Sequence, residues 1–415
     1  MNRSTWLLIA TLAIMVVSIS SFAPAQDSPL QGNIIKPPSS AGTVPGVRAR
    51  TDLLIVRPDG EFAPNSPPPN SENPGTLACI YGVTPPTNGC PFSGSPLATG
   101  GSKAIAVVEY GHNSTLQADF NTFNSYWGLP AQTLQFICDC ASCPSADGTG
   151  WDVETALDTQ YAHAMAPHAQ IIVSQFCNDP YTDPAPAAEV LGAQAVAGFG
   201  GGEVSNSFCE NFNNNPNCTE DPSELGYDQY MTEATVVFFA SAGDGGWGAL
   251  YPSSSPNVVS AGGTHIVRSS GQYTGAQTCW GGSGGGVSLY EPLPNYQLII
   301  GNKTGPKRGT PDYAADADPN TGVALYSTTG CGGWCKVGGT SVSSPVLAGI
   351  VNAAGKFVNH TASELHTSYN YYLNPGLYHQ YFYDVTSGSN GSGHNATLGW
   401  DECTGLGAPA NLAGF

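Results

Sequence analysis

Short apolar strand candidates alternate with longer helix candidates along most of this chain, and this alternation constrains the fold more than any other feature. Strands that alternate with helices favour a parallel sheet whose faces are covered by helices. The predicted strands are Ala104–Val108, Gln170–Ser174, Val236–Ala240 and Val258–Ala261, and the predicted helices are Leu116–Trp127, Val153–Ala166, Ala187–Ala197, Ser223–Thr235 and Ser344–Ala354. We therefore expect an α/β fold of three layers with a mostly parallel central sheet.

A glycine turn in the run Gly338–Pro345 leads into a helix of small residues and carries Ser341 at the start of that helix. Glycine allows close backbone approach, and the N–H groups of a helix N-terminus can face a developing oxyanion. The run therefore suits a nucleophilic serine. Taken alone it is equally typical of an ordinary turn, so the assignment depends on partners elsewhere in the chain.

Two acids, Glu154 and Asp158, are four residues apart in the predicted helix Val153–Ala166 and therefore share one helical face. A serine hydroxyl is a weak nucleophile that needs an adjacent base. Two carboxylates on one face repel each other unless they share a proton, and such a pair could act as that base. A surface helix with two solvated carboxylates is the ordinary alternative.

Asp244 follows the predicted strand Val236–Ala240 within the segment Ser241–Gly246. Ligand sites in open α/β sheets gather at the carboxyl ends of the strands, and catalytic groups favour loops on a rigid scaffold. Asp244 is therefore a candidate site residue. A turn-forming Asp-Gly pair is the alternative interpretation.

These residues belong to a series of ordered motifs that resembles the sedolisins, the serine-carboxyl peptidases, which have a subtilisin-like fold and act in acid. The series contains Glu154 and Asp158 with Ala166-Pro167, then Ser241–Asp244, Tyr251–Val259, Gly262–Thr264, Pro311-Asp312, Ala315–Val323, the run around Ser341, Gly399–Asp401 and Thr404–Gly407. Because the motifs keep their order over most of the chain, coincidence is a poor explanation.

The resemblance implies that Ser341 is the nucleophile, Glu154 its general base, Asp158 the carboxylate that orients Glu154, and Asp244 a stabiliser of the oxyanion. A carboxylate base works best near its own pKa, and a carboxyl group must be protonated to donate a hydrogen bond, so both roles point to acid. The rival subtilisin arrangement requires a histidine followed by Gly-Thr on a helix. None of the eight histidines has that setting.

The same resemblance suggests an extension of the acid pair. Some sedolisins couple it to a further glutamate and to a tryptophan, and the matching positions here are Glu109 and Phe208. Phenylalanine has no indole N–H donor, so we expect this extension to be altered. Ser205 and Ser207 either line the substrate cleft or belong to an ordinary strand.

A loop near the C-terminus suggests a cation site. It begins at Asp384, is rich in Gly, Ser and Asn, and closes at Asp401. Carboxylates with backbone carbonyls form an oxygen-only shell that suits Ca²⁺. The resemblance implies one structural calcium ion held by the side chains of Asp384 and Asp401 and by the carbonyls of Val385, Thr397 and Gly399. Thr397 replaces the glycine usual in the family, which affects loop geometry more than ligand chemistry.

The chain is strongly acidic, with 12 Lys and Arg against 31 Asp and Glu, a formal charge of −19 at pH 7 and a sequence pI near 4.5. Such a chain repels phosphate, so we expect no nucleic-acid partner. In mild acid its carboxyl groups take up protons and the net charge moves toward zero. The composition is therefore typical of a protein that works in acid.

The N-terminus predicts secretion. Arg3, the apolar run Trp6–Ile19 and an Ala-x-Ala site predict a signal peptide over residues 1–25, and the apolar run is too short for a membrane span. Residues 26–75 are rich in Pro, Ser and Gly and predict an extended lead-in without the long folded prosegment usual in sedolisins. Residues 76–415 are expected to form one peptidase domain.

The chain has 12 cysteines, and its single C-x-x-C pair, Cys140 and Cys143, has no second such pair to complete a zinc site, which favours disulfides in an oxidising compartment. Short loops favour the pairs Cys79 with Cys90, Cys209 with Cys218, and Cys331 with Cys335. Cys177 could meet Cys138, Cys140 or Cys143. Metal binding by that trio is the alternative.

Taken together, the sequence predicts a secreted, monomeric, calcium-stabilised serine-carboxyl endopeptidase that cleaves protein or peptide substrates in acid through an acyl-enzyme on Ser341. After removal of the signal peptide we expect no membrane association. Two alternatives stay open. One is an exopeptidase of the tripeptidyl-peptidase type with the same fold, and the other is a non-catalytic relative that binds peptides.

Overall fold

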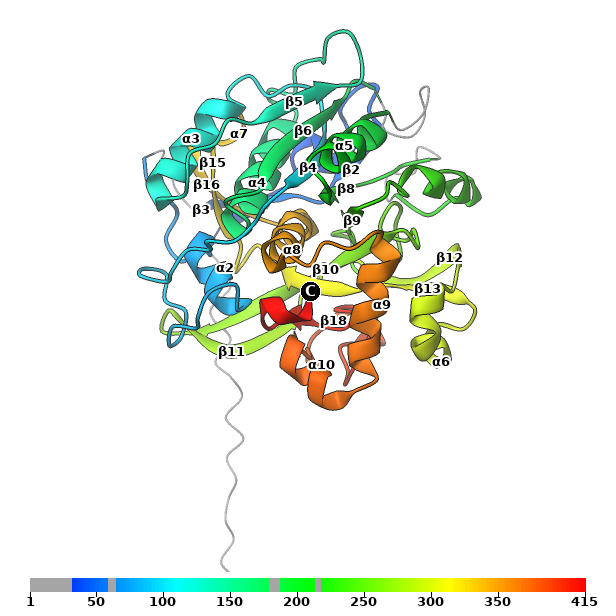
Figure 1. The fold of residues 1–415 in the computed structure, drawn as a ribbon. Coiled ribbons are helices and arrows are strands. Elements are labelled where there is room, and N and C mark those ends of the chain that lie inside the picture. The colour runs from blue at the N-terminus through cyan, green and yellow to red at the C-terminus, as the bar shows by residue number, and fades with distance from the viewer. Residues whose placement is uncertain (1–31, 59–64, 179–186, 213–217) are drawn as a thin grey trace, which may run out of the picture.

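The computed structural model describes residues 32–58, 65–178, 187–212 and 218–415. In this part of the chain the centre is an eight-stranded sheet with the order β11-β10-β9-β7-β4-β6-β5, and β14 pairs with β10 (Figure 1). Neighbouring strands are parallel except for β10 and β11. The strands are β4 (Ala104–Tyr110), β5 (Gln135–Cys138), β6 (Gln170–Phe176), β7 (Gly202–Asn206), β9 (Val236–Ser241), β10 (Val258–Ser269), β11 (Gln272–Cys279) and β14 (Tyr313–Asp316).

Helices cover both faces of this sheet. The main ones are α3 (Leu116–Trp127), α4 (Trp151–Met165), α5 (Ala187–Gly198) and α8 (Thr340–Ala354). Ile105 and Val107 of β4 belong to a core shared with α3, α4 and α8, whereas Ala106 and Val108 belong to a second core shared with α5. Alternate side chains of one strand thus face opposite layers. The expected three-layer α/β fold is confirmed, and the layers can be followed in Figure 1.

The strand and helix predictions are mostly correct, and the largest error is the predicted helix Ser223–Thr235. That segment instead forms two short 3₁₀ helices, η1 (Pro222–Gly226) and η2 (Asp228–Tyr230). Gly226 lies at the end of the first, and Thr235 has a positive φ of 66°, which no helix allows. The composition of this stretch therefore misled the helix prediction.

The start of α8 also differs from the prediction, in a way that matters for the site. The helix was expected from Ser344 but begins at Thr340, and Pro345 lies inside it, where the missing N–H leaves the Ser341 carbonyl without its usual helical donor. Ser341 consequently lies inside the first turn of the helix.

Residues near the N-terminus, read from the sequence as an extended lead-in, form short elements that pack on the sheet-bearing domain. They are β1 (Gly32–Ile35), α1 (Pro38–Ala41), β2 (Arg50–Thr51) and β3 (Leu54–Pro58). β3 lies between β1 and β16 (Gly333–Gly338) in a second sheet with the order β1-β3-β16-β15, where β15 is Val323–Ser327. β2 pairs with β8 (Phe208–Cys209). The predicted signal peptide, residues 1–25, lies outside the described residues.

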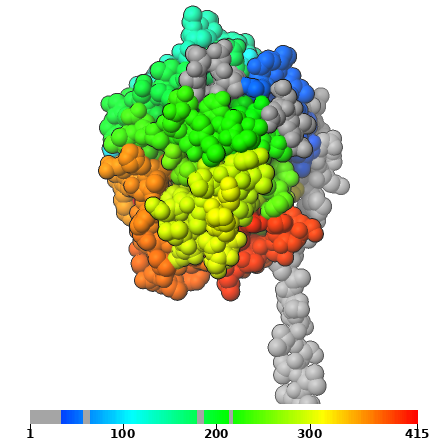
Figure 2. All heavy atoms as spheres, turned by 90° about the vertical axis from the view of Figure 1, so that its right-hand side faces the viewer, coloured from blue at the N-terminus to red at the C-terminus, as the bar shows by residue number. Residues whose placement is uncertain are grey.

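The remaining elements form loops and small sheets around this framework, and α9 (Thr361–Tyr372) packs against β9 and β10. Figure 2 shows green and yellow segments at the centre of one face, with orange and red segments along its lower edge. Among the described residues, no helix has both the length and the apolar character needed to cross a bilayer. The other elements are α2 (Pro74–Ile80), β12 (Gly286–Pro292), η3 (Asn295–Ile300), α6 (Gly301–Thr304), β13 (Lys307–Thr310), α7 (Thr328–Cys331), α10 (Pro375–Tyr381), β17 (Phe382–Tyr383), β18 (Ser389–Gly391), β19 (His394–Asn395), β20 (Ala408–Pro409) and η4 (Leu412–Gly414).

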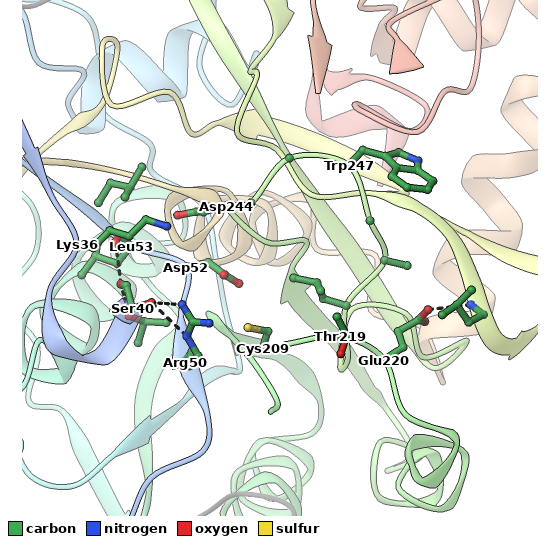
Figure 3. A pocket seen from close by; sticks show the side chains of 18 of the residues that line it. Lys36, Ser40, Arg50, Asp52, Leu53, Cys209, Thr219, Glu220, Asp244 and Trp247 are labelled. Carbon is green, nitrogen blue, oxygen red and sulfur yellow. Dashed lines mark hydrogen bonds between the residues drawn. The ribbon is translucent and has the colours of Figure 1, made fainter. Parts of the chain in front are cut away.

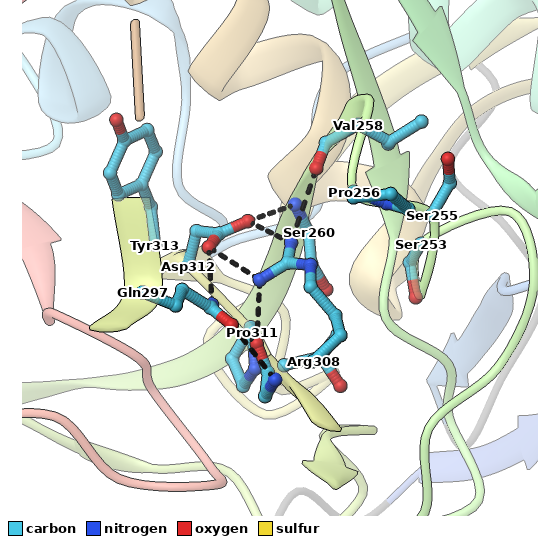
Figure 4. A network of polar contacts seen from close by, with 12 residues as sticks. Ser253, Ser255, Pro256, Val258, Ser260, Gln297, Arg308, Pro311, Asp312 and Tyr313 are labelled. Carbon is cyan, nitrogen blue, oxygen red and sulfur yellow. Dashed lines mark hydrogen bonds and ion pairs between the residues drawn. The ribbon is translucent and has the colours of Figure 1, made fainter. Parts of the chain in front are cut away.

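A buried ion pair fastens β14 to the start of β10 (Figure 4). Arg308 donates to both oxygens of Asp312, at 2.9 and 2.5 Å, and both side chains are fully buried. The Asp312 carboxylate also accepts from the backbone N–H of Ser260 at 2.9 Å and from the hydroxyl of Tyr369 at 2.9 Å. Because both carboxylate oxygens of Asp312 are satisfied by protein donors, this part of the Pro311-Asp312 motif has a structural role.

The disulfides agree with the short-loop predictions and add two further pairs. Cys177, for which three partners were open, pairs with Cys140. The bonds are Cys79–Cys90, Cys138–Cys143, Cys140–Cys177, Cys209–Cys218, Cys279–Cys403 and Cys331–Cys335. The four sulfurs around Cys177 lie within 4.8 Å of one another, a spacing that could hold a metal ion, but here they are joined in two disulfides.

Several carboxyl groups are buried without a cation, and Glu189 on α5 is a simple case. Its Oε1 accepts from Asn206 at 3.2 Å, its Oε2 has no partner among the described residues, and burial raises its pKa to about 7. Between the unfolded pKa and about 7, the folded chain therefore keeps a proton that the unfolded chain has lost. The free energy of unfolding falls as the pH rises through this window.

The Glu189→Gln variant should remove this contribution. We expect the loss of unfolding free energy between pH 4 and pH 8 to be smaller than in the wild type by about 3 kcal/mol. Urea denaturation at both pH values measures it. The partly exposed Glu233→Gln change is the matched control and should leave the pH dependence unaltered. An equal pH dependence in the Glu189 variant and the wild type would contradict the prediction.

Candidate active site

Ser341 lies in the first turn of α8, next to the N-cap residue Gly339. Gly339 has φ of 105°, and a Cβ atom there would lie 2.1 Å from the carbonyl oxygen of Asp52 and 2.5 Å from Oδ2 of Asp244. Glycine is therefore required both by the backbone conformation and by the close approach of two oxygens. The Ser341 side chain is fully buried, and its hydroxyl donates to the carbonyl of Ser207 at 3.2 Å.

The two acids on α4 face this serine. Every residue of α4 is buried, which excludes the alternative of a solvated surface helix. Glu154 lies close enough to the Ser341 hydroxyl for that contact to oppose the rise of its pKa, yet neither Glu154 oxygen accepts a hydrogen bond of ordinary geometry from a described residue. Burial, then the charges of Asp158 and Glu109, raise the pKa of Glu154 well above its usual value. With its pKa raised in this way, the Glu154 carboxyl group can exchange a proton with the Ser341 hydroxyl.

Asp158 links Glu154 to Glu109 at the end of β4. The hydroxyl of Ser207 donates to Asp158 Oδ1 at 2.9 Å, and both glutamates act on the pKa of Asp158. Burial raises the pKa of all three carboxyl groups, so neighbouring members share protons rather than all being ionised. Thr155 donates to Glu109 at 3.3 Å.

Residues flagged by the resemblance around this chain of acids have varied roles. Phe208 packs against Trp151 with ring centroids 6.1 Å apart, and the coupling of Glu109 to Asp158 exists without a tryptophan at position 208. Ser205 bonds to Ser344 of α8 at 2.9 Å and is buried, so it ties the helix to β7. Ser207 contacts Asp158, a contact that its sequence setting alone does not reveal.

Asp244 reaches the site from the loop after β9. Its Oδ1 accepts from the N–H and the hydroxyl of Thr340, at 2.7 and 3.0 Å. Its Oδ2 has no partner among the residues described and faces the same side of Gly339 as the Asp52 carbonyl oxygen. Burial raises the pKa of Asp244 to about 6, although the hydrogen bonds from Thr340 act to lower it. A protonated Asp244 could therefore donate from Oδ2.

Asp52 is the site neighbour that the sequence analysis missed. Its carbonyl oxygen accepts from the Ser341 N–H at 3.0 Å, and its own N–H donates to the Ser207 carbonyl at 3.3 Å. Its side chain accepts from Ser241 at 2.6 Å. The only available signal was the apolar run Leu53–Val56 inside a stretch otherwise typical of a linker.

A cavity of about 530 Å³ adjoins these residues (Figure 3). One wall comes from the N-terminal segment, with Lys36, Arg50 and Asp52, and the other from the loop that carries Asp244 and Trp247. In Figure 3 the labelled Asp52 and Asp244 side chains lie between Lys36 and Arg50 on one side and Trp247 on the other. Asp244 therefore lines this cavity, whereas Ser341, Glu154 and Asp158 are not among its lining residues.

The candidate calcium loop brings its two acids around Gly399. The N–H of Gly399 donates to Asp384 at 3.0 Å, and the N–H of Thr397 donates to Asp401 at 2.9 Å. In the described chain, the carbonyls of Val385, Thr397 and Gly399 accept no hydrogen bond. Burial raises the pKa of Asp401 to about 6. Carboxylate and carbonyl oxygens are the donor types that suit Ca²⁺, and here the oxygens of Asp384 and Asp401 accept backbone N–H groups.

The chain is similar to several serine-carboxyl peptidases. Kumamolisin from Bacillus sp. (strain MN-32) is 30% identical over 348 residues, which are 75% of this chain and 59% of kumamolisin. Sedolisin from Pseudomonas sp. (strain 101) is 33% identical over 175 residues, 38% of this chain and 28% of that protein. Tripeptidyl-peptidase sed4 from Aspergillus fumigatus is 31% identical over 201 residues, 38% of this chain and 31% of that protein. The chain thus spans well under two thirds of the length of these relatives.

Similarity in structure agrees. A solved structure of Pseudomonas sedolisin, a serine-carboxyl proteinase complexed with pseudo-iodotyrostatin, superposes with a TM-score of 0.65 and 26% identity, covering 83% of this chain and 96% of that one. No family model matches the chain. The fold, the order of the motifs and these relatives together support one conclusion: the chain belongs to the sedolisin family.

Proposed function

We propose that the protein is a secreted serine-carboxyl endopeptidase that cleaves protein or peptide substrates in acid. The observation that carries the proposal is the setting of Ser341. Its hydroxyl faces the acids Glu154 and Asp158, while its N–H binds a peptide carbonyl, that of Asp52. A nucleophile, a base and a carbonyl partner therefore meet at one buried point.

The reaction follows from these positions. Ser341 Oγ attacks the carbonyl carbon of the scissile bond as Glu154 takes its proton, and Asp158 orients Glu154. The oxyanion is stabilised by the Ser341 N–H and by protonated Asp244. Glu154 then returns the proton to the leaving amine as the C–N bond breaks. A water molecule attacks the resulting ester and regenerates Ser341, giving a carboxylic acid product.

The role of Asp244 sets a pH limit and gives a prediction. Since Asp244 has a pKa of about 6, its protonated, donating fraction decreases as the pH rises above that value. Asp244→Asn supplies an N–H donor at every pH, but in a different geometry. We expect kcat to fall about 100-fold at pH 4, and the decrease of kcat near pH 6 to be lost. A pH profile of kcat measures both effects, and an unchanged profile would contradict the assigned role.

Internal cleavage is favoured over removal of N-terminal tripeptides by the course of residues 50–58. This stretch passes Ser341 with chain continuing on both sides, pairing with β8 before Asp52 and with β16 after it. A cleft closed after three residues could not hold such a chain. Fragments of a denatured protein, identified by mass after digestion at about pH 3 to 7, test the proposal. Internal cuts support it, short N-terminal fragments alone indicate the exopeptidase, and no cleavage indicates a peptide-binding relative.

We further propose that Asp384, Asp401 and the carbonyls of Val385, Thr397 and Gly399 hold one structural Ca²⁺. The ion would neutralise the two acids and fix the loop. Chelation of calcium should therefore lower the thermal midpoint, because calcium at one thousand times its Kd stabilises the folded state by about 4 kcal/mol. Differential scanning calorimetry with EGTA measures the effect. The Asp401→Ala variant should show a low midpoint that EGTA does not change, and a wild-type midpoint insensitive to EGTA would contradict the site.

Secretion through a signal peptide over residues 1–25, a monomeric state and the absence of nucleic-acid or membrane partners belong to the same proposal. They rest on the apolar N-terminal run, the predicted disulfides and the acidic composition. The mass of the protein recovered from culture medium, together with its mass in solution, tests cleavage after residue 25 and the monomeric state.

A further inference from the structure

The carboxyl ends of β5 and β6 bring four cysteines together at the edge of the main sheet. Cys138 is the last residue of β5, Cys140 and Cys143 follow on the next loop, and Cys177 comes directly after β6. The two strands are parallel, with Cys138 opposite Gln175, so their ends lie side by side. The pairing of the strands therefore adds two cysteines to the single C-x-x-C pair of the sequence.

Main-chain hydrogen bonds hold this loop independently of its sulfur atoms. The N–H of Asp139 donates to the carbonyl of Gln175 at 3.0 Å, and the N–H of His112 donates to the carbonyl of Pro144 at 2.7 Å. The N–H of Ala146 in turn donates to the carbonyl of His112 at 2.9 Å. Both ends of the loop are thus fixed to the neighbouring chain, and we expect the loop to keep its place when the sulfur–sulfur bonds open.

The four sulfur atoms form a compact group. All four lie within 4.8 Å of one another, which holds for no other group of three or more His, Cys, Asp or Glu side chains in the described chain. Between the two disulfides, Cys138 Sγ lies 3.6 Å from Cys140 Sγ and 3.7 Å from Cys177 Sγ, and Cys143 Sγ lies 3.5 Å from Cys177 Sγ. Four sulfurs at about 2.3 Å from a zinc ion are about 3.8 Å apart in a tetrahedron. These contacts therefore have the spacing of a zinc tetrathiolate, and only the two bonded pairs need to separate.

This cluster is accessible, unlike the other disulfides. Cys140 is exposed, and Cys138, Cys143 and Cys177 are half-buried. The eight cysteines of the other four disulfides are all buried, with exposed fractions of 7% or less. Exposed disulfides are generally the labile ones, because a reductant must reach the sulfur that it attacks. A mild reductant should therefore open the two bonds of the cluster before the other four.

We propose that Cys138, Cys140, Cys143 and Cys177, once reduced, form a tetrathiolate site for one Zn²⁺. A zinc ion held by four thiolates has no open position, so its role would be structural. It would hold β5, at the edge of the sheet, to the neighbouring strand β6. The inference does not depend on the proposed peptidase function, because no cysteine takes part in that reaction.

The change from two disulfides to a metal site balances with a dithiol as the reductant. Each protein disulfide takes two electrons and two protons from one dithiol, which itself becomes a disulfide, so two dithiols yield four protein thiols. Zn²⁺ then forms four Zn–S bonds and displaces four protons into solution. Because zinc competes with protons for the sulfurs, binding should require a reducing medium near neutral pH. In acid and without a reductant, the same four cysteines should stay as disulfides.

Cobalt is the probe that tests this site, because a thiolate bound to Co²⁺ gives a sulfur-to-cobalt charge-transfer absorption that oxygen ligands do not give. The full chain is reduced near neutral pH with Co²⁺ present. A phosphine replaces the dithiol as the two-electron reductant, because a dithiol would itself bind the metal. We expect one Co²⁺ per chain with charge-transfer absorption, which Zn²⁺ in excess should abolish. Near-ultraviolet circular dichroism, which reports on the fold, should be kept.

A parallel sample without metal locates the thiols that a limiting amount of phosphine releases. Alkylation and peptide mass mapping should find them at the four cluster positions. Equal labelling of all twelve cysteines would contradict selective opening and overturn the assignment of the site to this cluster. Absence of charge-transfer absorption from the reduced wild type would overturn the proposal, whether or not the dichroism is kept.

Variants separate the cluster from other sources of thiols. Cys177→Ser should bind Co²⁺ at least about 100-fold more weakly than the wild type, because a hydroxyl does not replace a thiolate ligand. Cys140→Ser serves in its place where that variant fails to fold. The matched control is the double change Cys331→Ser and Cys335→Ser, which removes a buried disulfide with a similarly short loop and should leave Co²⁺ binding unaltered. Equal affinity in the cluster variant and the wild type would overturn the proposal.

Discussion

Replacing Ser341 by alanine should lower kcat for a peptide substrate by about 10⁴- to 10⁶-fold, as removal of a nucleophile does in serine hydrolases generally. The hydroxyl is the atom that forms the acyl bond, and neither Glu154 nor Asp244 can replace it. The thermal midpoint should change little, because the Ser341 hydroxyl makes one hydrogen bond in the structure, to Ser207. Initial rates at pH 4 with a quenched fluorescent peptide measure the effect.

The matched control is Ser344→Ala, on the same helix. Ser344 is as buried as Ser341 and bonds to Ser205 at 2.9 Å. Its loss should cost about 1 kcal/mol of stability and leave kcat within a factor of two or so. If Ser341→Ala kept more than roughly a tenth of wild-type kcat, another residue would have to be the nucleophile.

Glu154→Gln should give the second large effect, a decrease of kcat by about 10³- to 10⁴-fold. Glutamine preserves the size of the side chain but cannot accept and return the proton of Ser341. The KM should change little, because Glu154 makes no hydrogen bond to the segment in the cleft. Among the described residues, neither of its oxygens has a hydrogen-bond partner. Steady-state kinetics that separate kcat from KM test this expectation.

Glu203, a second buried acid, is the control that separates the loss of a buried carboxyl group from the loss of the catalytic base. Glu203 accepts from Asn352 at 2.7 Å, and burial raises its pKa well above the usual value. Glu203→Gln should therefore increase stability at neutral pH, as Glu154→Gln also should, but leave kcat unaltered. Equal losses of kcat in the two variants would show that Glu154 acts through packing and not as a base.

The fold was largely predictable because the periodicity of buried strands is a local property. β4, β6, β9 and β10 begin where their apolar runs begin, and α3 has the predicted bounds. Ser223–Thr235 failed because a helical composition could not reveal the positive φ at Thr235, which the surrounding structure imposes. Three disulfides were predictable because short loops limit the choice of partner. The pair Cys279–Cys403 spans 124 positions and was not.

In the site too, features that depend on neighbouring residues were predictable, and features that depend on distant parts of the chain were not. The motifs around Ser341, Glu154 and Asp244 could be recognised one at a time, but their meeting point depends on the stacking of α4 and α8. Asp52 had no signal beyond the apolar run that follows it, since a segment that is held by its backbone needs no particular side chains. The contacts of Asp52 to Ser341 and Ser207 are made by main-chain atoms. A sequence motif carries no information about such contacts.

Glu154 and Asp158 are fully buried near Ser341, and the main chain of Asp52 contacts the Ser341 N–H. Burial, followed by the charges of Asp158, Glu109 and Asp52, raises the pKa of Glu154, and burial followed by the charge of Asp244 raises the pKa of Asp52. Occupation of the cleft by a segment that has a carboxylate at the position of Asp52 is thus coupled to uptake of protons from solution. By thermodynamic linkage, acidification strengthens the binding of such a segment and alkalinity weakens it. Acid therefore favours the docked N-terminal segment over a substrate that has no carboxylate at this position.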